Sequence, residues 1–382
     1  MGRRRGGRVD RPVVGPAFAL ATAPAAAALR NAPAALLAAT ADQPPAGRDR
    51  FLSMSDIRYD PGDLTELRAL QADRLAAEAV ERYVRAAKWT EVIAPNLSLI
   101  WRLPALDGYD GGVLPTADYA ALQTLFVPAE TRLPDGRLRE QLRAMPAARL
   151  LDLADVRFVI TDKQRDLWDR DVYYDLEQPV TLHGGDRLTL PLAGYPPFSA
   201  TALGIVAEAE AASAAATVSV TDAQGRTVAL PLAPQPVGAA PRADRLAFGA
   251  AMTPTTVTVA VADDALAAVT VRGLSLFDAR TAAHQSITLS PAGDLRRIHS
   301  GDVKVYERAS APGRAWLVLG VRPVADADAA WRGLADDDFD PRTTVLLSGD
   351  FAGRPAGAAL PGESVRATTF EAERIVLRVE AL

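Results

Sequence analysis

Several kinds of residue are scarce or missing in this 382-residue chain. Cysteine is absent, which excludes disulfide scaffolds, thiolate zinc sites and cysteine nucleophiles. There are only three histidines (His183, His284 and His299), too few for a histidine-rich metal centre, and we expect no cofactor. No stretch reaches about 18 uninterrupted apolar residues, so the sequence as written predicts no membrane-spanning helix.

The charge balance is mildly acidic. The chain has 42 Lys and Arg against 47 Asp and Glu, for a net charge of −5, which argues against nucleic acid as a partner. Lys88, Lys163 and Lys304 are the only lysines. We attribute the excess of arginine, together with the many alanine runs, to coding bias. The hydrophobic content of 49% excludes global disorder, and the length predicts two or three domains.

Residues 1–47 differ from the rest and are interpreted as a leader or linker. A basic start is followed by an apolar stretch and by Ala21-Thr22-Ala23, a pattern typical of secretory signals. An Ala/Pro-rich leader and a stub following a membrane helix fit equally well. Cleavage after Ala23 would leave Pro24 as the first residue, which is awkward for a cleavage site.

Residues 48–177 predict the first part of an α/β domain. Apolar residues at helical spacing predict helices, and short β-prone runs predict strands, with the run after Val156 expected at the centre of a sheet. The expected strands are Arg50–Met54, Asn96–Trp101 and Val156–Ile160. The expected helices are 64–75, Ala77–Lys88, Tyr119–Phe126 and Leu138–Leu153, the last interrupted at Pro146.

The chain changes character after residue 177. Residues 178–300 contain many short alternating segments separated by turns, which predict an antiparallel, jelly-roll-like β-sandwich. Residues 301–350 return to an α/β pattern, with strands at Ala315–Leu319 and Thr343–Leu347, and 351–382 form a truncated β segment. The predicted fold is thus mixed α and β: an α/β domain, begun before 177 and completed after 300, with a β-sandwich inserted into it.

Two groups of residues are candidate binding sites. Asp107, Tyr109 and Asp110 lie among three glycines, so the carboxylates could hold a cation or sugar hydroxyls beside an aromatic face. A tight turn explains the same residues.

The second group is aromatic and acidic. Trp168, Tyr173 and Tyr174 precede the predicted sandwich, together with Asp169 and Asp171. This composition suits carbohydrate, but it also suits packing between domains. No catalytic residue can be assigned, because 47 acidic residues always provide some pair of carboxylates. A nucleophile elbow and a phosphate-binding loop are both absent from the sequence.

Six stretches in fixed order carry a family resemblance. They begin at Arg50-Phe51-Leu52-Ser53 and Ala94-Pro95-Asn96-Leu97, and they end at Pro312-Gly313-Arg314-Ala315-Trp316-Leu317-Val318. Between these lie Leu106-Asp107-Gly108-Tyr109-Asp110, residues 151–162 (LDLADVRFVITD) and Val303-Lys304-Val305-Tyr306-Glu307. Residues 48–382 resemble the large extracytoplasmic region of the YfhO-like bacterial membrane proteins.

The resemblance implies a place in the cell envelope. Members of that family are similar to polytopic glycosyltransferases that use polyprenyl-phosphate sugars, and their acidic catalytic residues lie between membrane helices that this sequence does not contain. The expected function is therefore a non-catalytic extracytoplasmic module in envelope glycan or lipid glycosylation. Its partners would be the membrane helices of the parent protein and an envelope glycan or lipid-linked sugar. The alternatives are a stand-alone secreted carbohydrate-binding protein and, with the least support, a soluble hydrolase.

Overall fold

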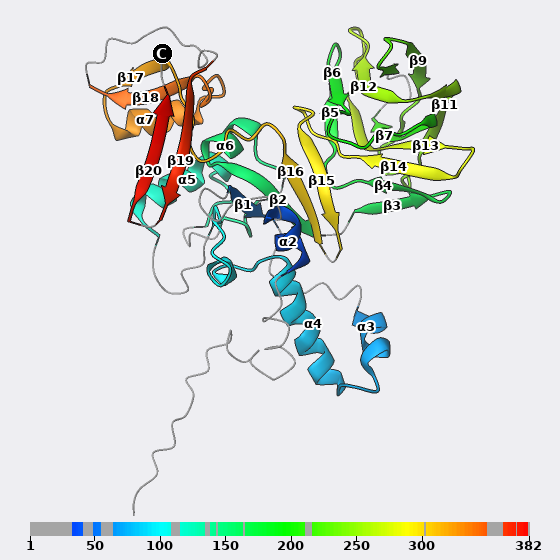
Figure 1. Cartoon of the computed structure of the whole chain (residues 1–382). Coiled ribbons are helices and arrows are strands. Elements are labelled where there is room, and N and C mark those ends of the chain that lie inside the picture. Colours follow the sequence, from blue (N-terminus) through cyan, green and yellow to red (C-terminus); the bar gives the residue numbers. More distant parts are fainter. Residues whose placement is uncertain are drawn as a thin grey trace, which may run out of the picture.

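A computed structural model gives the fold of this protein (Figure 1). A four-stranded sheet lies in the middle, a sandwich of a six-stranded and a four-stranded sheet lies on one side, and a small βαβ unit lies on the other. The fold is mixed α and β with sandwich-like sheets, which confirms the predicted class. The structure describes residues 33–40, 49–54, 64–107, 115–133, 138–142, 144–162, 165–210, 216–301, 303–349, 362–371 and 373–380.

The central sheet joins strands from both ends of the chain. Its order is β1-β2-β16-β15, where β2 runs parallel to β1 and antiparallel to β16. The chain therefore leaves this sheet after β2, forms the sandwich, and returns to pair β16 with β2. The four strands are β1 (Arg50–Ser53), β2 (Val156–Asp162), β15 (Leu295–Ser300) and β16 (Val303–Arg308). Residues 295–300, predicted as part of the sandwich, form β15 and pair with β16 of the central sheet instead.

Both faces of the central sheet are buried. One apolar cluster joins Phe158 and Val305 to the end of helix α4, and a second joins Leu52 and Val159 to Phe126 and other side chains. Burial on both faces explains why β2 is a nearly continuous apolar run. The helices around the sheet are α2 (Ala34–Thr40), α3 (Leu64–Gln71), α4 (Ala77–Glu91), η2 (Leu97–Leu99), α5 (Ala117–Phe126) and α6 (Ala148–Leu153).

The sandwich consists of two sheets that share one apolar core. One sheet has the order β10-β7-β13-β14, with β11 and β5 pairing to β7 and β13, and the other has the order β6-β12-β8-β9. Inward side chains such as Leu203, Val257 and Leu274 are fully buried between the sheets, as the period-2 pattern requires. The strands are β5 (Val180–Leu182), β6 (Arg187–Pro191), β7 (Ala200–Ala209), β8 (Ala216–Asp222), β9 (Thr227–Leu232), β10 (Gln235–Pro236), β11 (Asp244–Met252), β12 (Pro254–Val261), β13 (Val269–Asp278) and β14 (Ala283–Ile287).

A hairpin links the central sheet to the sandwich. It comprises β3 (Asp166–Asp169) and β4 (Val172–Asp175), and β4 lies against β13 and β14. The approach is close at Gly204 of β7, because a Cβ at that position would overlap the Tyr174 hydroxyl. Glycine there lets the hairpin pack directly on the sandwich.

The C-terminal part contains two small units. Strands β17 (Gly320–Val324) and β18 (Thr344–Ser348) are parallel and are connected by α7 (Ala327–Ala335), whose N-cap Asp326 accepts a hydrogen bond from the Ala329 backbone. Strands β19 (Ser364–Phe370) and β20 (Ile375–Glu380) form an antiparallel hairpin. No helix in the described ranges is long and apolar enough to cross a membrane.

Three predicted elements were wrong. The strand expected at 96–101 is the 3-10 turn η2, because Asn96 takes a left-handed φ of 69° that interrupts an extended backbone. The helix expected at 138–153 forms only over α6, beyond Pro146. The strand expected at 315–319 begins instead at Gly320, and Trp316 donates a hydrogen bond from Nε1 to the Pro341 carbonyl at 2.8 Å.

Candidate functional site

The first predicted binding loop is only partly described. Tyr109 and Asp110 lie outside the described residues. Asp107 is buried, and Arg139 binds it through Nε to Oδ2 at 2.7 Å and through Nη2 to Oδ1 at 3.2 Å. Arg139 also donates to the carbonyls of Val92 and Ile93. This carboxylate ties a loop to the end of α4, and no part of its side chain is accessible to a ligand.

The hairpin β3–β4 separates the three aromatic residues of the second group. Trp168 and Tyr173 are cross-strand neighbours with ring centroids 5.3 Å apart, and Trp168 is 65% exposed. His284 of β14 meets the Trp168 ring edge-on at 5.7 Å. Tyr174 points to the other face of the hairpin and is fully buried against Val172 and Val206. The structure therefore brings Trp168 and Tyr173 together and places Tyr174 in the packing between hairpin and sandwich.

Beneath Tyr173 lies a buried network of charges centred on Lys304 of β16. The Lys304 ammonium is completely buried and lies 2.6 Å from Asp166 Oδ1, 2.8 Å from Asp175 Oδ1 and 3.8 Å from Glu177 Oε2. Tyr306, two residues further along the strand, donates its hydroxyl to Asp175 Oδ2 at 2.9 Å. One lysine of the central sheet is thus neutralised by three acids from the hairpin and the segment after it.

Arg297 of β15 completes this network. Its guanidinium lies over the Tyr173 ring at 4.6 Å, donates to the Tyr173 hydroxyl at 2.5 Å and approaches Asp175 Oδ2 at 3.3 Å. The Tyr173 hydroxyl donates in turn to Asp166 at 2.7 Å. Burial, reinforced by these hydrogen bonds to carboxylates, raises the pKa of Tyr173 and of Tyr306, so both act as hydrogen-bond donors.

This network stabilises the contact between the hairpin and the central sheet. Asp166, Asp175, Lys304, Tyr306 and Arg297 satisfy one another, whereas Glu177 joins the network only through the 3.8 Å approach to Lys304. No group of three His, Asp or Glu side chains within the described ranges is arranged to hold a metal ion. The network also fixes Tyr173, which is the inner neighbour of the exposed Trp168 ring.

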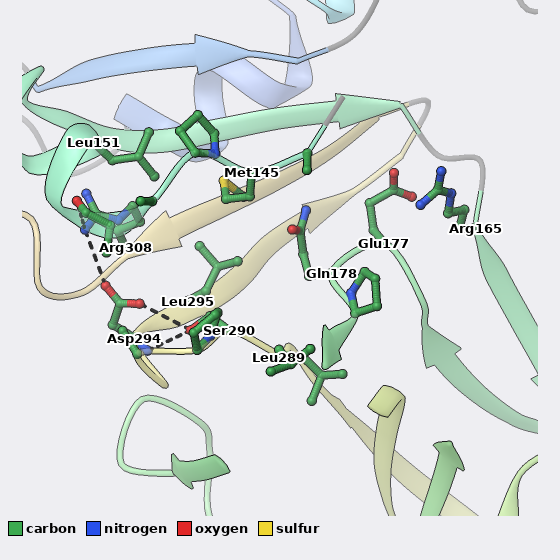
Figure 2. Close-up of a pocket in the computed structure, with 18 residues that line it drawn as sticks. Met145, Leu151, Arg165, Glu177, Gln178, Leu289, Ser290, Asp294, Leu295 and Arg308 are labelled. Carbon is green, nitrogen blue, oxygen red and sulfur yellow. Dashed lines mark hydrogen bonds and ion pairs between the residues drawn. The ribbon is translucent and has the colours of Figure 1, made fainter. Parts of the chain in front are cut away.

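A cleft of about 430 Å³ lies where the central sheet meets the start of the sandwich (Figure 2). Its walls are mainly aliphatic and include Met145, Leu151, Leu289 and Leu295, with prolines at the rim. None of the described residues lining it is aromatic. Volume and lining fall within the range of small-molecule sites, which often lie between domains.

The polar groups of the cleft gather at two ends. At one end Asp294 accepts from Ser290 and lies 3.7 Å from Arg308, whose guanidinium is also held by Asp152 at 2.8 Å. At the other end are Arg165, Glu177 and Gln178 (Figure 2), and the same three residues line an adjoining space of about 110 Å³.

The second end has unused hydrogen-bonding capacity. Glu177 Oε2 is buried and has no hydrogen-bond partner among the described residues. Within the same described part of the chain, the Gln178 amide and the Arg165 guanidinium also make no hydrogen bond. Burial raises the pKa of Glu177 despite the nearby charge of Lys304.

The sequence patterns missed the residues that build these features. Lys304 carried a signal, since a lysine between Val303 and Val305 in a strand completing a central sheet must find acidic partners. For Arg297, His284, Glu177 and Gln178 there was no comparable signal, because their neighbours include residues from distant segments of the chain.

Comparisons with known proteins show little similarity. No protein-family model matches the chain, and no curated protein sequence matches it. One solved structure that aligns with it comes from work titled "Structural and functional characterization of Pseudomonas aeruginosa AlgX", at 10% identity and a TM-score of 0.20. The alignment covers 59% of this chain and 47% of that one.

Proposed function

We propose that this chain is a non-catalytic, carbohydrate-binding module on the extracytoplasmic face of the cell membrane, belonging to a YfhO-like protein. The resemblance of the six ordered stretches supports the family and the location. The exposed Trp168 ring supports carbohydrate as the ligand, and the proposed binding role rests mainly on this ring.

The surroundings of Trp168 favour a sugar ring. The Trp168 ring is 65% exposed and offers a flat aromatic face of the kind on which the C–H face of a sugar ring stacks. Tyr173 and His284 hold the ring in place at 5.3 and 5.7 Å, so little conformational freedom would be lost on binding. The next two residues, Asp169 and Arg170, bond to each other and to the Ala243 backbone, so the binding role rests on the aromatic ring itself.

The test is binding of the purified chain to a glycan array, followed by calorimetric titration of the best ligand. Trp168→Ala is expected to weaken that binding about tenfold or more, because about 1.4 kcal/mol of lost stacking corresponds to a factor of ten. Leu266→Ala is the matched control, since Leu266 is another exposed apolar side chain on the sandwich. Equal affinity for Trp168→Ala and the unaltered chain would contradict the proposal.

The proposed partner is the set of membrane helices of the parent protein. Coding sequence for several apolar helices beside this region would support it.

A stand-alone secreted protein is the second candidate, favoured by the basic and apolar start ending at Ala21-Thr22-Ala23. N-terminal sequencing of secreted material tests that candidate, and recovery of an intact Met1 from the cytoplasm would contradict it.

A further inference from the structure

The cleft of Figure 2 and the Trp168 surface differ in chemistry. Sugar rings stack on aromatic faces, and Trp168 offers one, whereas the described lining of the cleft is aliphatic and contains no ring other than proline. A concave aliphatic surface gains most by taking a flexible aliphatic chain out of water, at roughly 25 cal/mol per Å². The cleft therefore suits a different kind of ligand from the Trp168 surface.

The two polar ends of the cleft differ in whether their hydrogen-bonding groups already have partners within the protein. The charges of Asp294 and Arg308 are used within the protein, because Arg308 donates to Asp152 at 2.8 Å and to the Val156 carbonyl at 3.0 Å, and Ser290 and Ser310 bond Asp294. A ligand gains little by placing a polar group there. At the opposite end, Glu177 Oε2 is desolvated and lacks a hydrogen bond within the described structure, which is costly until a donor arrives.

The head group can be inferred from the charges at that end. Arg165 contributes a cation and Glu177 an acid, while Gln178 lines the cleft beside them and offers both a donor and an acceptor (Figure 2). The carboxylate of Glu177 disfavours an anionic head group, and the guanidinium of Arg165 disfavours a cationic one. Hydroxyl groups both donate and accept, and so they match all three side chains.

We infer that this cleft binds the aliphatic chain of an uncharged amphiphile, with a hydroxylated head group placed at Arg165, Glu177 and Gln178. The inference goes beyond the proposed carbohydrate site and does not depend on it, because the two use different residues and different parts of a ligand.

Calorimetric titration of the full chain with octyl β-D-glucoside, below the concentration at which it forms micelles, tests the inference. Saturable one-to-one binding is expected. Methyl β-D-glucoside has the same head without the chain and is expected to bind at least tenfold more weakly. Octyl sulfate has the same chain with an anionic head and is also expected to bind more weakly.

Two variants locate the binding in the cleft. Ala292→Trp fills the cleft from its exposed rim and is expected to reduce octyl glucoside affinity at least tenfold, whereas Ala223→Trp, on the exposed turn between β8 and β9, should leave it unchanged. Gln178→Ala removes only the head-group contact and is expected to weaken octyl glucoside several-fold while leaving octyl sulfate little affected.

The outcomes separate this inference from the carbohydrate proposal. Trp168→Ala should leave octyl glucoside binding intact, even where it abolishes glycan binding. Absence of saturable binding, or equal affinity in Ala292→Trp and the unaltered chain, would overturn the cleft as a site. Tighter binding of octyl sulfate than of octyl glucoside would overturn the uncharged head group.

Discussion

The sandwich and the central sheet are built from different interiors. The sandwich core consists of aliphatic and aromatic side chains from two facing sheets. The unit around the central sheet has similar apolar clusters, but it also buries charged side chains, among them Arg139, Arg308 and Lys304 with their acidic partners. An apolar core is stabilised by any close packing, whereas a buried charge requires a specific partner at a specific distance.

The two units therefore differ in how much their interiors depend on distant segments of the chain. The sandwich obtains its whole core from one continuous segment. The central sheet needs Lys304 from β16 to meet Asp175 from the hairpin, and Arg308 to meet Asp152 of α6. We therefore expect the central sheet to respond to loss of a single charge, and the sandwich to respond to loss of volume.

The largest effect is expected for Lys304→Met. Methionine has nearly the same volume but no charge, so three carboxylates lose their buried cation, at a cost of about 3–5 kcal/mol in the free energy of unfolding. Urea denaturation followed by circular dichroism measures it. In the sandwich, Leu203→Ala is the counterpart, with a cavity cost of about 2–5 kcal/mol. A neutral or stabilising Lys304→Met would show that the two interiors do not differ as proposed.

A smaller, pH-dependent effect is expected at Asp155, which pairs with Arg314 at 3.0 Å. Burial raises the pKa of Asp155 to about 6, against the lowering effect of Arg314. The folded chain then holds this proton more tightly than the unfolded chain, so its contribution to stability is greatest below about pH 4 and is lost as the pH rises to about 6, by at most roughly 3 kcal/mol.

Asp155→Asn tests this assignment. Asparagine accepts the positive φ of 55° at this position, and the variant should lose less stability between about pH 4 and 6 than the unaltered chain does. Asp278→Asn is the sandwich control, because the Arg280 hydrogen bond lowers the pKa of Asp278 to about 2, outside that interval. Identical pH profiles for Asp155→Asn and the unaltered chain would contradict the assignment.

The smallest effect is expected for an exposed ion pair. Arg82 lies one turn after Glu78 on α4, with Nη2 to Oε2 at 3.6 Å, and both side chains reach solvent. Arg82→Ala should change the free energy of unfolding by less than about 0.5 kcal/mol. A loss comparable to that of Lys304→Met would mean that burial does not set the value of a charge in this unit.

The apolar interior was largely predictable from the sequence. The alternation in residues 178–300 predicted the sandwich, although the last six residues belong to the central sheet, and the run from Val156 predicted the interior strand β2. Local failures came where one residue overrode the pattern, as at Asn96, where a left-handed backbone replaced the expected strand.

The candidate sites were less predictable because they depend on contacts between distant segments. Trp168 and Tyr173 were found because they are close in sequence and face each other across a hairpin. The cleft combines Met145, Glu177 and Leu295, which no spacing rule connects. The burial of Asp107 depends on its ion pair with Arg139, and no sequence pattern connects these two residues.

The pairing of β2 with β16 also has a consequence for how the chain acquires its structure. Ile160 and Val305 are strand partners, and the whole sandwich lies between them in sequence. Joining such distant strands carries a loop-closure cost that grows slowly with length, and it slows folding unless the intervening chain is already compact. A sandwich that folds first brings β2 and β16 close together. We therefore expect the central sheet to assemble after the sandwich in a refolding experiment.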